Sequence, residues 1–253
     1  MQLLLPHQKI AFCHAPVCPV RAEKTDRSEM VTQLTFGETV EIIDQDQHWI
    51  HVQSLSDGYV GMTDRRHLLG ISEKELRNWH DQRQVQSELA AWIETPWGHQ
   101  MNPAGCFHGS ENTFMIGAYS FQSSKDHYPN TNKDFLNSML NVPYLWGGKT
   151  AFGIDCSGFT QLYFRIRDFN LPRDASEQQK IGEEIELMDA RMGDLLFFSN
   201  PSGNIIHVGV YTEENKIIHA SGRVRIDCLE NGNIWNDELK ETTHWFHSIR
   251  RYL

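Results

Sequence analysis

Short stretches of alternating apolar and polar residues follow one another over the first 70 residues, and each is bounded by a turn. Residues 36–43 begin with a Gly-Glu turn and then alternate, residues 48–53 alternate again, and residues 57–61 run from an Asp-Gly turn into a further strand. Period-two alternation between turn residues predicts half-buried strands. We therefore predict a small β-barrel domain over residues 1–70.

The pattern changes after residue 70. Residues 71–89 carry Leu76, Trp79 and Val85 on a rough apolar stripe, which predicts a helix that joins two domains. Residues 91–122 return to strand and turn composition. The segment 71–132 is accordingly predicted as a linker helix followed by a possible second barrel, and a short helix is expected at 133–141.

The last segment, residues 133–253, combines a helix with strands that carry reactive side chains. Residues 162–167 have helical composition, and Asp155 is a candidate N-cap in front of them, directly before Cys156. The later strands at 207–211 and 217–220 carry one histidine each, His207 and His219. This pattern predicts an α+β domain in which a nucleophile and a base come from different elements.

The position of Cys156 distinguishes it from the other four cysteines. Cysteine is among the most buried residue types, so that an isolated cysteine is usually part of an inert core. A thiol in the first turn of a helix instead lies at the positive end of the helix dipole, which favours the thiolate. The sequence therefore predicts Cys156 as a nucleophile, and core positions for Cys13, Cys18, Cys106 and Cys228.

The two histidines are predicted to share one face of a hairpin. If Tyr211 pairs with Ile217 across the intervening turn, period-two alternation places His207 and His219 on the same face as diagonal neighbours, roughly 7 to 8 Å apart at the backbone. An imidazole ring is long enough to close that gap. His219 would then orient the ring of His207 and hold the tautomer whose free nitrogen takes the thiol proton.

Composition narrows the possible partners and the compartment. A net charge of −10, with adjacent basic pairs only at 65–66 and 250–251, argues against nucleic acid or an anionic membrane as the main partner. No apolar run approaches the roughly 18 residues of a membrane span. An odd number of cysteines and an N-terminal stretch without the basic region of a signal peptide predict a cytoplasmic protein.

No metal or organic cofactor is predicted. Cys13, Cys18 and His14 form a minor alternative as a zinc site, but no second ligand pair follows at a supporting spacing. Residues 147–149, Gly-Gly-Lys, lack the spacing of a phosphate-binding loop and are interpreted as a turn.

Six short motifs follow one another in the last domain: Tyr-x-Trp-Gly-Gly (144–148), Asp-Cys-Ser-Gly-Phe (155–159), Leu-Pro-Arg-Asp-Ala-Ser-Glu-Gln (171–178), Gly-Asp-Leu-Leu-Phe-Phe (193–198), His-Val-Gly-Val-Tyr (207–211) and Ile-His-Ala-Ser (218–221). In this order they resemble the NlpC family of papain-like cell-wall cysteine peptidases. The resemblance implies Cys156 as nucleophile, His207 as base and His219 as the third, orienting residue. It also implies active-site or substrate-groove positions for Tyr144, Trp146, Asp155, Ser157 and Asp174.

Three of these groove residues have a purely structural alternative. For Tyr144 and Trp146 the alternative is a core position for an aromatic residue before a glycine turn. Asp174 begins the sequence Asp-Ala-Ser-Glu, which has the spacing of a capping box.

The first 70 residues resemble bacterial SH3-like domains, which accompany cell-wall hydrolases. Together the two resemblances imply a papain-like cysteine peptidase domain behind one or two SH3-like barrels, similar to the γ-D-glutamyl-L-diamino acid endopeptidases. Such an enzyme cuts peptidoglycan stem peptides between D-Glu and the diamino acid, and its barrel selects a free N-terminal L-Ala. The alternatives are a secreted hydrolase of intact peptidoglycan and a catalytically silent wall-binding module.

Overall fold

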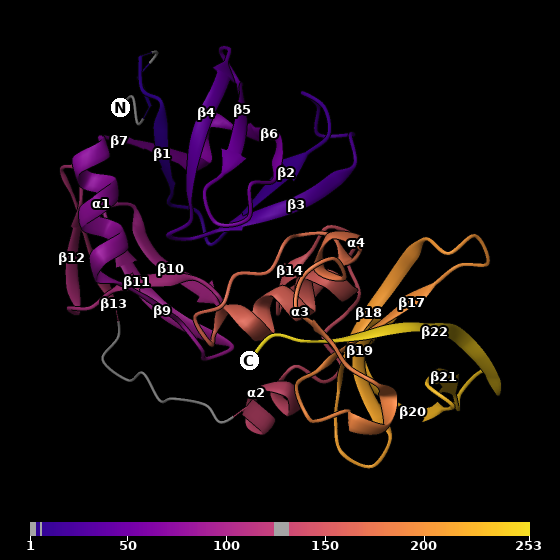
Figure 1. The fold of residues 1–253 in the computed structure, drawn as a ribbon. Helices are drawn as coiled ribbons and strands as arrows, with labels where there is room; N and C mark the ends of the chain where they lie inside the picture. The colour runs from indigo at the N-terminus through magenta and orange to yellow at the C-terminus, as the bar shows by residue number, and fades with distance from the viewer. Residues whose placement is uncertain (1–3, 6, 124–131) are drawn as a thin grey trace. The chain divides into compact units, whose positions relative to one another are not determined.

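The computed structural model describes residues 4–5, 7–123 and 132–253, which form two compact units. Unit 1 comprises Met1–Asn132 and Arg165–Asn170, and unit 2 comprises Lys133–Phe164 and Leu171–Leu253. Figure 1 draws most of unit 1 in indigo to magenta and the strands of unit 2 in orange to yellow. Within the described part of the chain, no helix is long and apolar enough to span a membrane.

The first sheet of unit 1 is antiparallel, with the strand order β3-β2-β6-β5-β4-β1-β7 (Figure 1). The predicted alternation is clearest in β5, in which every second residue is buried. The predicted Asp-Gly turn precedes β6, and Gly58 adopts a φ of 73°, a region that glycine enters without steric cost. The elements are β1 (Ile10–Cys13), β2 (Val17–Arg21), β3 (Met30–Thr35), β4 (Thr39–Gln45), β5 (Trp49–Ser54), β6 (Val60–Asp64), the 3₁₀ turn η1 (Arg65–His67) and β7 (Leu68–Ile71).

Helix α1 (Glu73–Gln82) follows the first sheet and is shorter than the sequence pattern predicts. Its start is fixed by a capping box between Ser72 and Glu75. The predicted continuation to residue 89 is wrong, because Arg83–Val85 forms strand β8, which pairs with β11 (Phe107–Gly109). Val85 extends the apolar stripe of the helix, but a single apolar residue at that distance fits a strand equally well.

A second sheet and an aromatic core complete unit 1. The sheet has the strand order β10-β9-β13-β12, and Trp79 of α1 donates its indole N–H to the carbonyl of Gly37 at 2.8 Å. Both sheets and α1 contribute to one core of buried aromatic rings: Phe12, Phe36, Trp79, Phe114 and Phe121. The strands are β9 (Ala90–Thr95), β10 (Gly98–Pro103), β12 (Thr113–Ile116) and β13 (Tyr119–Ser123). Residues 124–131 of the predicted middle segment lie outside the described residues.

Unit 2 places short helices and a small hairpin before a second seven-stranded sheet. The helix predicted at 133–141 is α2 (Asn132–Ser138), and α3 (Cys156–Arg165) begins at the predicted cysteine, with all but its last residue in unit 2. The other elements before the main strands are β14 (Lys149–Thr150), β15 (Gly153–Ile154), α4 (Ala175–Gln178), β16 (Glu183–Glu184) and the 3₁₀ turn η2 (Leu187–Asp189).

Six strands of the second sheet close into a ring. The strand order is β16-β22-β17-β18-β19-β20-β21, and β21 pairs in addition with β22, so that the sheet returns to its own start. An apolar cluster that includes Phe198, Ile217 and Ile234 forms a core on one face of these strands. The strands are β17 (Leu195–Ser199), β18 (Ile205–Tyr211), β19 (Lys216–Ser221), β20 (Arg223–Glu230), β21 (Asn233–Asn236) and β22 (Glu241–Arg251).

Candidate active site

Asp155 builds the helix start that carries Cys156. Its carboxylate accepts a hydrogen bond from the backbone N–H of Gly158 at 2.7 Å, which is the interaction of an N-cap with the first turn of its helix. The other carboxylate oxygen accepts from the N–H of Gly147 at 2.8 Å, and so ties the glycine turn to the helix. The predicted N-cap is confirmed, and Cys156 is the first residue of α3.

A buried arginine, Arg173, bonds the side chains at the start of α3. Arg173 forms an ion pair with Asp155 and donates to the hydroxyl of Ser157 at 2.8 Å. The side chains of Arg173 and Asp155 are only 2% and 7% exposed. Asp155 and Ser157, which the resemblance implies as groove residues, are thus both held in a buried hydrogen-bond network that fixes the first turn of α3.

The thiol of Cys156 is not stabilised as a thiolate in this environment. Burial, followed by the negative charge of Asp155, raises the pKa of Cys156 to about 12, and backbone hydrogen bonds from Val208 and Ser157 offset this only in part. The prediction of a thiolate favoured by the helix start is therefore wrong, because desolvation outweighs the helix dipole. Cys156 needs a base to become a nucleophile.

The hairpin of β18 and β19 carries His207, the predicted base. Tyr211 pairs with Ile217, and the predicted register is confirmed. The rings of His207 and His219 meet on one face, with 2.8 Å between Nε2 of His207 and Nδ1 of His219. The backbone of Val208, the residue after His207 on β18, is one of the groups that lower the pKa of Cys156, so the start of α3 lies near this part of β18.

Two further residues at this site were missed by the sequence analysis. Oδ2 of Asp227, on β20, lies 3.1 Å from Nε2 of His219. The ring of His244, on β22, stacks on that of His207 with 4.1 Å between centroids and 29° between planes. Their sequence signal is only that Asp227 and His244 lie in strand-like segments, because their register depends on strands that pair across turns and a bulge.

All three histidines are held in the neutral form. Burial lowers the pKa of His207 well below its ordinary value, and the neighbouring His219 and His244 lower it further. Burial also lowers the pKa of His219, against the opposing effect of Asp227. Burial lowers the pKa of His244 to about 4. At neutral pH the resting pair is therefore a thiol beside an uncharged imidazole.

The other predicted groove residues differ in their exposure. Tyr144 is half-buried, and burial, followed by its interaction with Cys156, raises the pKa of its hydroxyl to about 12. Trp146 is 62% exposed, so that it is not a core residue. Asp174 occupies the N-cap position of α4 but makes no side-chain capping hydrogen bond, which leaves the capping-box alternative without support.

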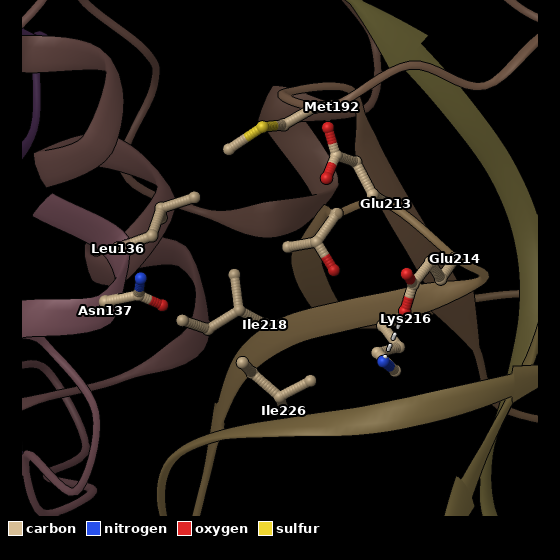
Figure 2. Close-up of a pocket in the computed structure, with 9 residues that line it drawn as sticks. Leu136, Asn137, Met192, Glu213, Glu214, Lys216, Ile218 and Ile226 are labelled. Atoms are coloured by element: carbon tan, nitrogen blue, oxygen red, sulfur yellow. Dashed lines mark hydrogen bonds and ion pairs between the residues drawn. The ribbon is translucent and has the colours of Figure 1, made fainter. Parts of the chain in front are cut away.

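A separate pocket of about 190 Å³ lies on the face of β19 opposite to the one that carries His219 (Figure 2). Ile218 and Ile226 form part of its wall and are directly paired across β19 and β20. Since neighbouring residues of a strand point to opposite faces, Ile218 and His219 face in opposite directions. The pocket contains none of the candidate catalytic residues.

Comparison with known proteins decides the family. The NlpC/P60 family pattern matches residues 141–244, and that of the bacterial dipeptidyl-peptidase SH3 domain matches residues 20–65. Over 216 residues the chain is 31% identical to the γ-D-glutamyl-L-lysine dipeptidyl-peptidase of Bacillus subtilis (strain 168), and the match covers 75% of this chain and 71% of that protein. The chain belongs to the NlpC/P60 family of cysteine peptidases.

Two further NlpC/P60 proteins show how far the similarity extends. The chain is 37% identical over 143 residues to the murein DD-endopeptidase MepS/murein LD-carboxypeptidase of Escherichia coli (strain K12), which covers 53% of this chain and 72% of that protein. The crystal structure of an NlpC/P60 family protein from Bacillus cereus superimposes with a TM-score of 0.78 at 18% identity, over 96% of this chain and 99% of that one. The second similarity concerns the fold alone.

The NlpC/P60 assignment places the peptidase domain in unit 2 and the SH3-like domain in unit 1. The predicted α+β class is confirmed only in part, since strands make up 47% of the structure and helices 15%. The strands lie chiefly in the sheets of unit 1 and in the six-stranded ring of unit 2, which carries His207, His219 and His244. Among the described residues no group of three or more His, Cys, Asp or Glu side chains is arranged to hold a metal ion.

Acidification is expected to destabilise unit 2. His244 has a pKa of about 4 in the folded state against an ordinary value of 6.5, so the unfolded chain binds more protons between these values. Stability is therefore retained above pH 6.5 and lost as the pH falls toward 4, with a slope of up to about 1.4 kcal/mol per pH unit for each such histidine. Urea unfolding between pH 7.5 and 4.5 measures this slope.

A matched pair of variants identifies the source of the acid sensitivity. His244→Gln should flatten the pH dependence of the unfolding free energy, whatever its effect at pH 7.5. His247→Gln, which replaces an exposed histidine of the same strand, should leave the slope unchanged. Equal slopes in the native protein and His244→Gln would contradict the expectation.

Proposed function

We propose that this NlpC/P60 peptidase hydrolyses the bond between D-Glu and the diamino acid in peptidoglycan stem peptides that carry a free N-terminal L-Ala. The observation that carries the peptidase chemistry is the buried hydrogen bond between His207 and His219 on the strand that also contacts Cys156. The bond specificity rests on the B. subtilis γ-D-glutamyl-L-lysine dipeptidyl-peptidase, because the similarity to that protein extends over 75% of this chain.

In the proposed mechanism His207 removes the thiol proton as the sulfur of Cys156 attacks the carbonyl carbon of the γ-D-Glu amide. Backbone N–H groups at the start of α3 and the hydroxyl of Tyr144 stabilise the oxyanion. The C–N bond then breaks, and the imidazolium of His207 gives its proton to the leaving amine. A thioester remains on Cys156. His207 next removes a proton from water, which attacks the thioester and restores the thiol.

The predicted groove residues divide into two groups in this proposal. Tyr144, Trp146 and Asp174 contact the substrate, since none of the three is buried. Asp155 and Ser157 hold the helix start, since their polar atoms already bond Arg173 and the backbone. The ammonium group at the free amino terminus of the peptide is bound by an acidic side chain, since an ammonium group taken out of water needs a countercharge.

The alternative is hydrolysis of intact peptidoglycan. It is favoured by the higher identity, 37%, to the E. coli murein endopeptidase, although that match spans 143 residues, 53% of this chain. A relative that shares chiefly one part of the chain is a weaker guide to specificity than one that matches 75% of it.

A panel of three substrates separates these functions. The peptides are L-Ala-γ-D-Glu-L-Lys or its diaminopimelate counterpart, the same peptides with an acetylated amino terminus, and purified sacculi. Cleavage of the free peptide to L-Ala-D-Glu and the diamino acid, at least about tenfold faster than cleavage of the acetylated peptide, supports the proposal, since an unpaired buried site for an ammonium group rejects a neutral amide. Release of fragments from sacculi without cleavage of the free peptide would contradict it.

A further inference from the structure

Asp227 is a buried carboxylate to which the mechanism above gives no role. It lies on β20, and its side chain is only 3% exposed. One of its oxygens, Oδ2, lies 3.1 Å from Nε2 of His219. His219 in turn contacts His207, so that three side chains from three neighbouring strands form one hydrogen-bonded chain.

The second oxygen of Asp227 is occupied by Arg225. Two nitrogens of the guanidinium, Nε and Nη2, donate to Oδ1 at 3.1 and 2.9 Å. Arg225 is itself held by Glu238, whose Oε2 accepts from Nη1 at 2.8 Å. The carboxylate of Asp227 therefore has one oxygen fixed on Arg225 and the other directed at His219.

Counting protons along this chain fixes the tautomer of both rings. An ionised carboxylate only accepts hydrogen bonds, so Nε2 of His219 must carry a proton. Nδ1 of the neutral His219 is then an acceptor, and Nε2 of His207 must donate to it. The neutral ring of His207 is left with a lone pair on Nδ1, which is the form that can take a proton from a thiol.

We propose that Asp227 is a positioning residue that acts through His219 to hold His207 in the tautomer able to deprotonate Cys156. The inference rests on the proposed roles of Cys156 and His207. With the opposite tautomers, Nδ1 of His207 would carry a proton and could not act as the base. In a Ser-His-Asp triad the aspartate fixes the tautomer of the histidine that it contacts. Asp227 fixes the tautomer of His207 in the same way, but through the intervening ring of His219.

The other charged and titratable groups around the two rings do not supply this function. His244, on β22, faces both rings, at 4.1 Å between its centroid and that of His207 and 5.9 Å from that of His219. Its Nδ1 lies 2.9 Å from the hydroxyl of Thr243, and its contact with His207 is a ring stack. Arg225 and Glu238 act on Asp227 and are not hydrogen-bonded to either ring in any described contact.

Asp227→Asn is the discriminating variant because it keeps the shape of the side chain. The two donors of Arg225 require an acceptor, so the amide oxygen of the asparagine stays on Arg225. Its NH₂ group then faces Nε2 of His219 and donates to it. That nitrogen can no longer carry a proton, and the tautomers of both rings are reversed.

We expect Asp227→Asn to lower kcat on the order of 10²-fold, with KM within about threefold of the native value, since the base and not substrate binding is affected. Asp237→Asn is the matched control, because Asp237 is an exposed aspartate of the same region, paired with Lys240, and its replacement should leave kcat unchanged. In a His219→Ala background, Asp227→Asn should lower kcat by less than about a further threefold, because the residue through which Asp227 acts is missing.

The ¹⁵N NMR spectrum of imidazole-labelled full-length protein supplies a readout that needs no substrate. Nδ1 of His207 should report an unprotonated nitrogen in the native protein and in Asp237→Asn, and a protonated one in Asp227→Asn. An unchanged tautomer, or an undiminished loss of kcat in the His219→Ala background, would overturn the inference. If the peptide substrates proved wrong, the spectra would still decide the role of Asp227.

Discussion

Cys156→Ala is expected to lower the rate of γ-D-glutamyl peptide hydrolysis by about 10⁴-fold or more. Removal of the sulfur removes the covalent step itself, and only transition-state binding by the remaining groups is left. The measurement is the rate at which the diamino acid is released from the free tripeptide, with the released diamino acid quantified by chromatography. KM is not interpretable at such a low rate, so the comparison is made at one saturating substrate concentration.

The matched control is Cys228→Ala, which removes an exposed thiol from β20 in the same unit. The core position predicted for Cys228 is wrong, because its side chain lies on the solvent side of β20, whereas Cys13, Cys18 and Cys106 are buried as predicted. It should retain the native rate, and both variants should keep the native circular dichroism spectrum. Loss of less than about tenfold in Cys156→Ala would show that another group performs the attack.

His207→Ala is expected to cost on the order of 10³-fold in kcat at pH 7, because a thiol whose pKa is raised to about 12 is almost entirely protonated without a base. The pH profile should also change its form. The native kcat, measured at saturating substrate so that titration of the substrate's amino group does not enter, should be independent of pH above neutrality, since His207 is already uncharged there. The residual rate of the variant should rise about tenfold per pH unit, in proportion to the thiolate fraction.

His247→Ala is the control for this experiment, since it removes an exposed histidine of β22. It should reproduce both the native rate and the native profile. A flat profile in His207→Ala would indicate that the thiolate is formed by some other base, and a rate that falls as the pH rises would indicate a protonated group in place of a base.

The parts of the site that follow from local sequence were predicted correctly. The hairpin register depends on a short turn between residues 211 and 217 and on period-two alternation, both of which are local. The N-cap is also a local interaction, because the carboxylate of Asp155 accepts a hydrogen bond from the N–H of Gly158, only three residues later. Local rules therefore placed Cys156, His207 and His219.

The parts that depend on distant strands were not predictable in the same way. Asp227 reaches His219 only because β20 pairs with β19, and His244 reaches His207 only through the closure of β22 on β17 and β21. The pKa of Cys156 is likewise set by tertiary burial, which a single sequence does not reveal, and so the helix-dipole argument alone gave the wrong protonation state. The end of α1 at Gln82 was missed for the same reason, since β8 exists only as the partner of β11.

Closure of the six-stranded ring has a consequence for the order in which activity appears during synthesis. β22 follows the other five strands of this closed sheet in the sequence. It closes the sheet by pairing with both β17 and β21, and it carries His244, whose imidazole stacks on that of His207. A nascent chain that has emerged only as far as β20 already holds Cys156, His207, His219 and Asp227, but two strand edges are still unpaired. Nearly the whole peptidase domain must therefore emerge from the ribosome before the histidines are fully buried. Only then are they held in the uncharged form.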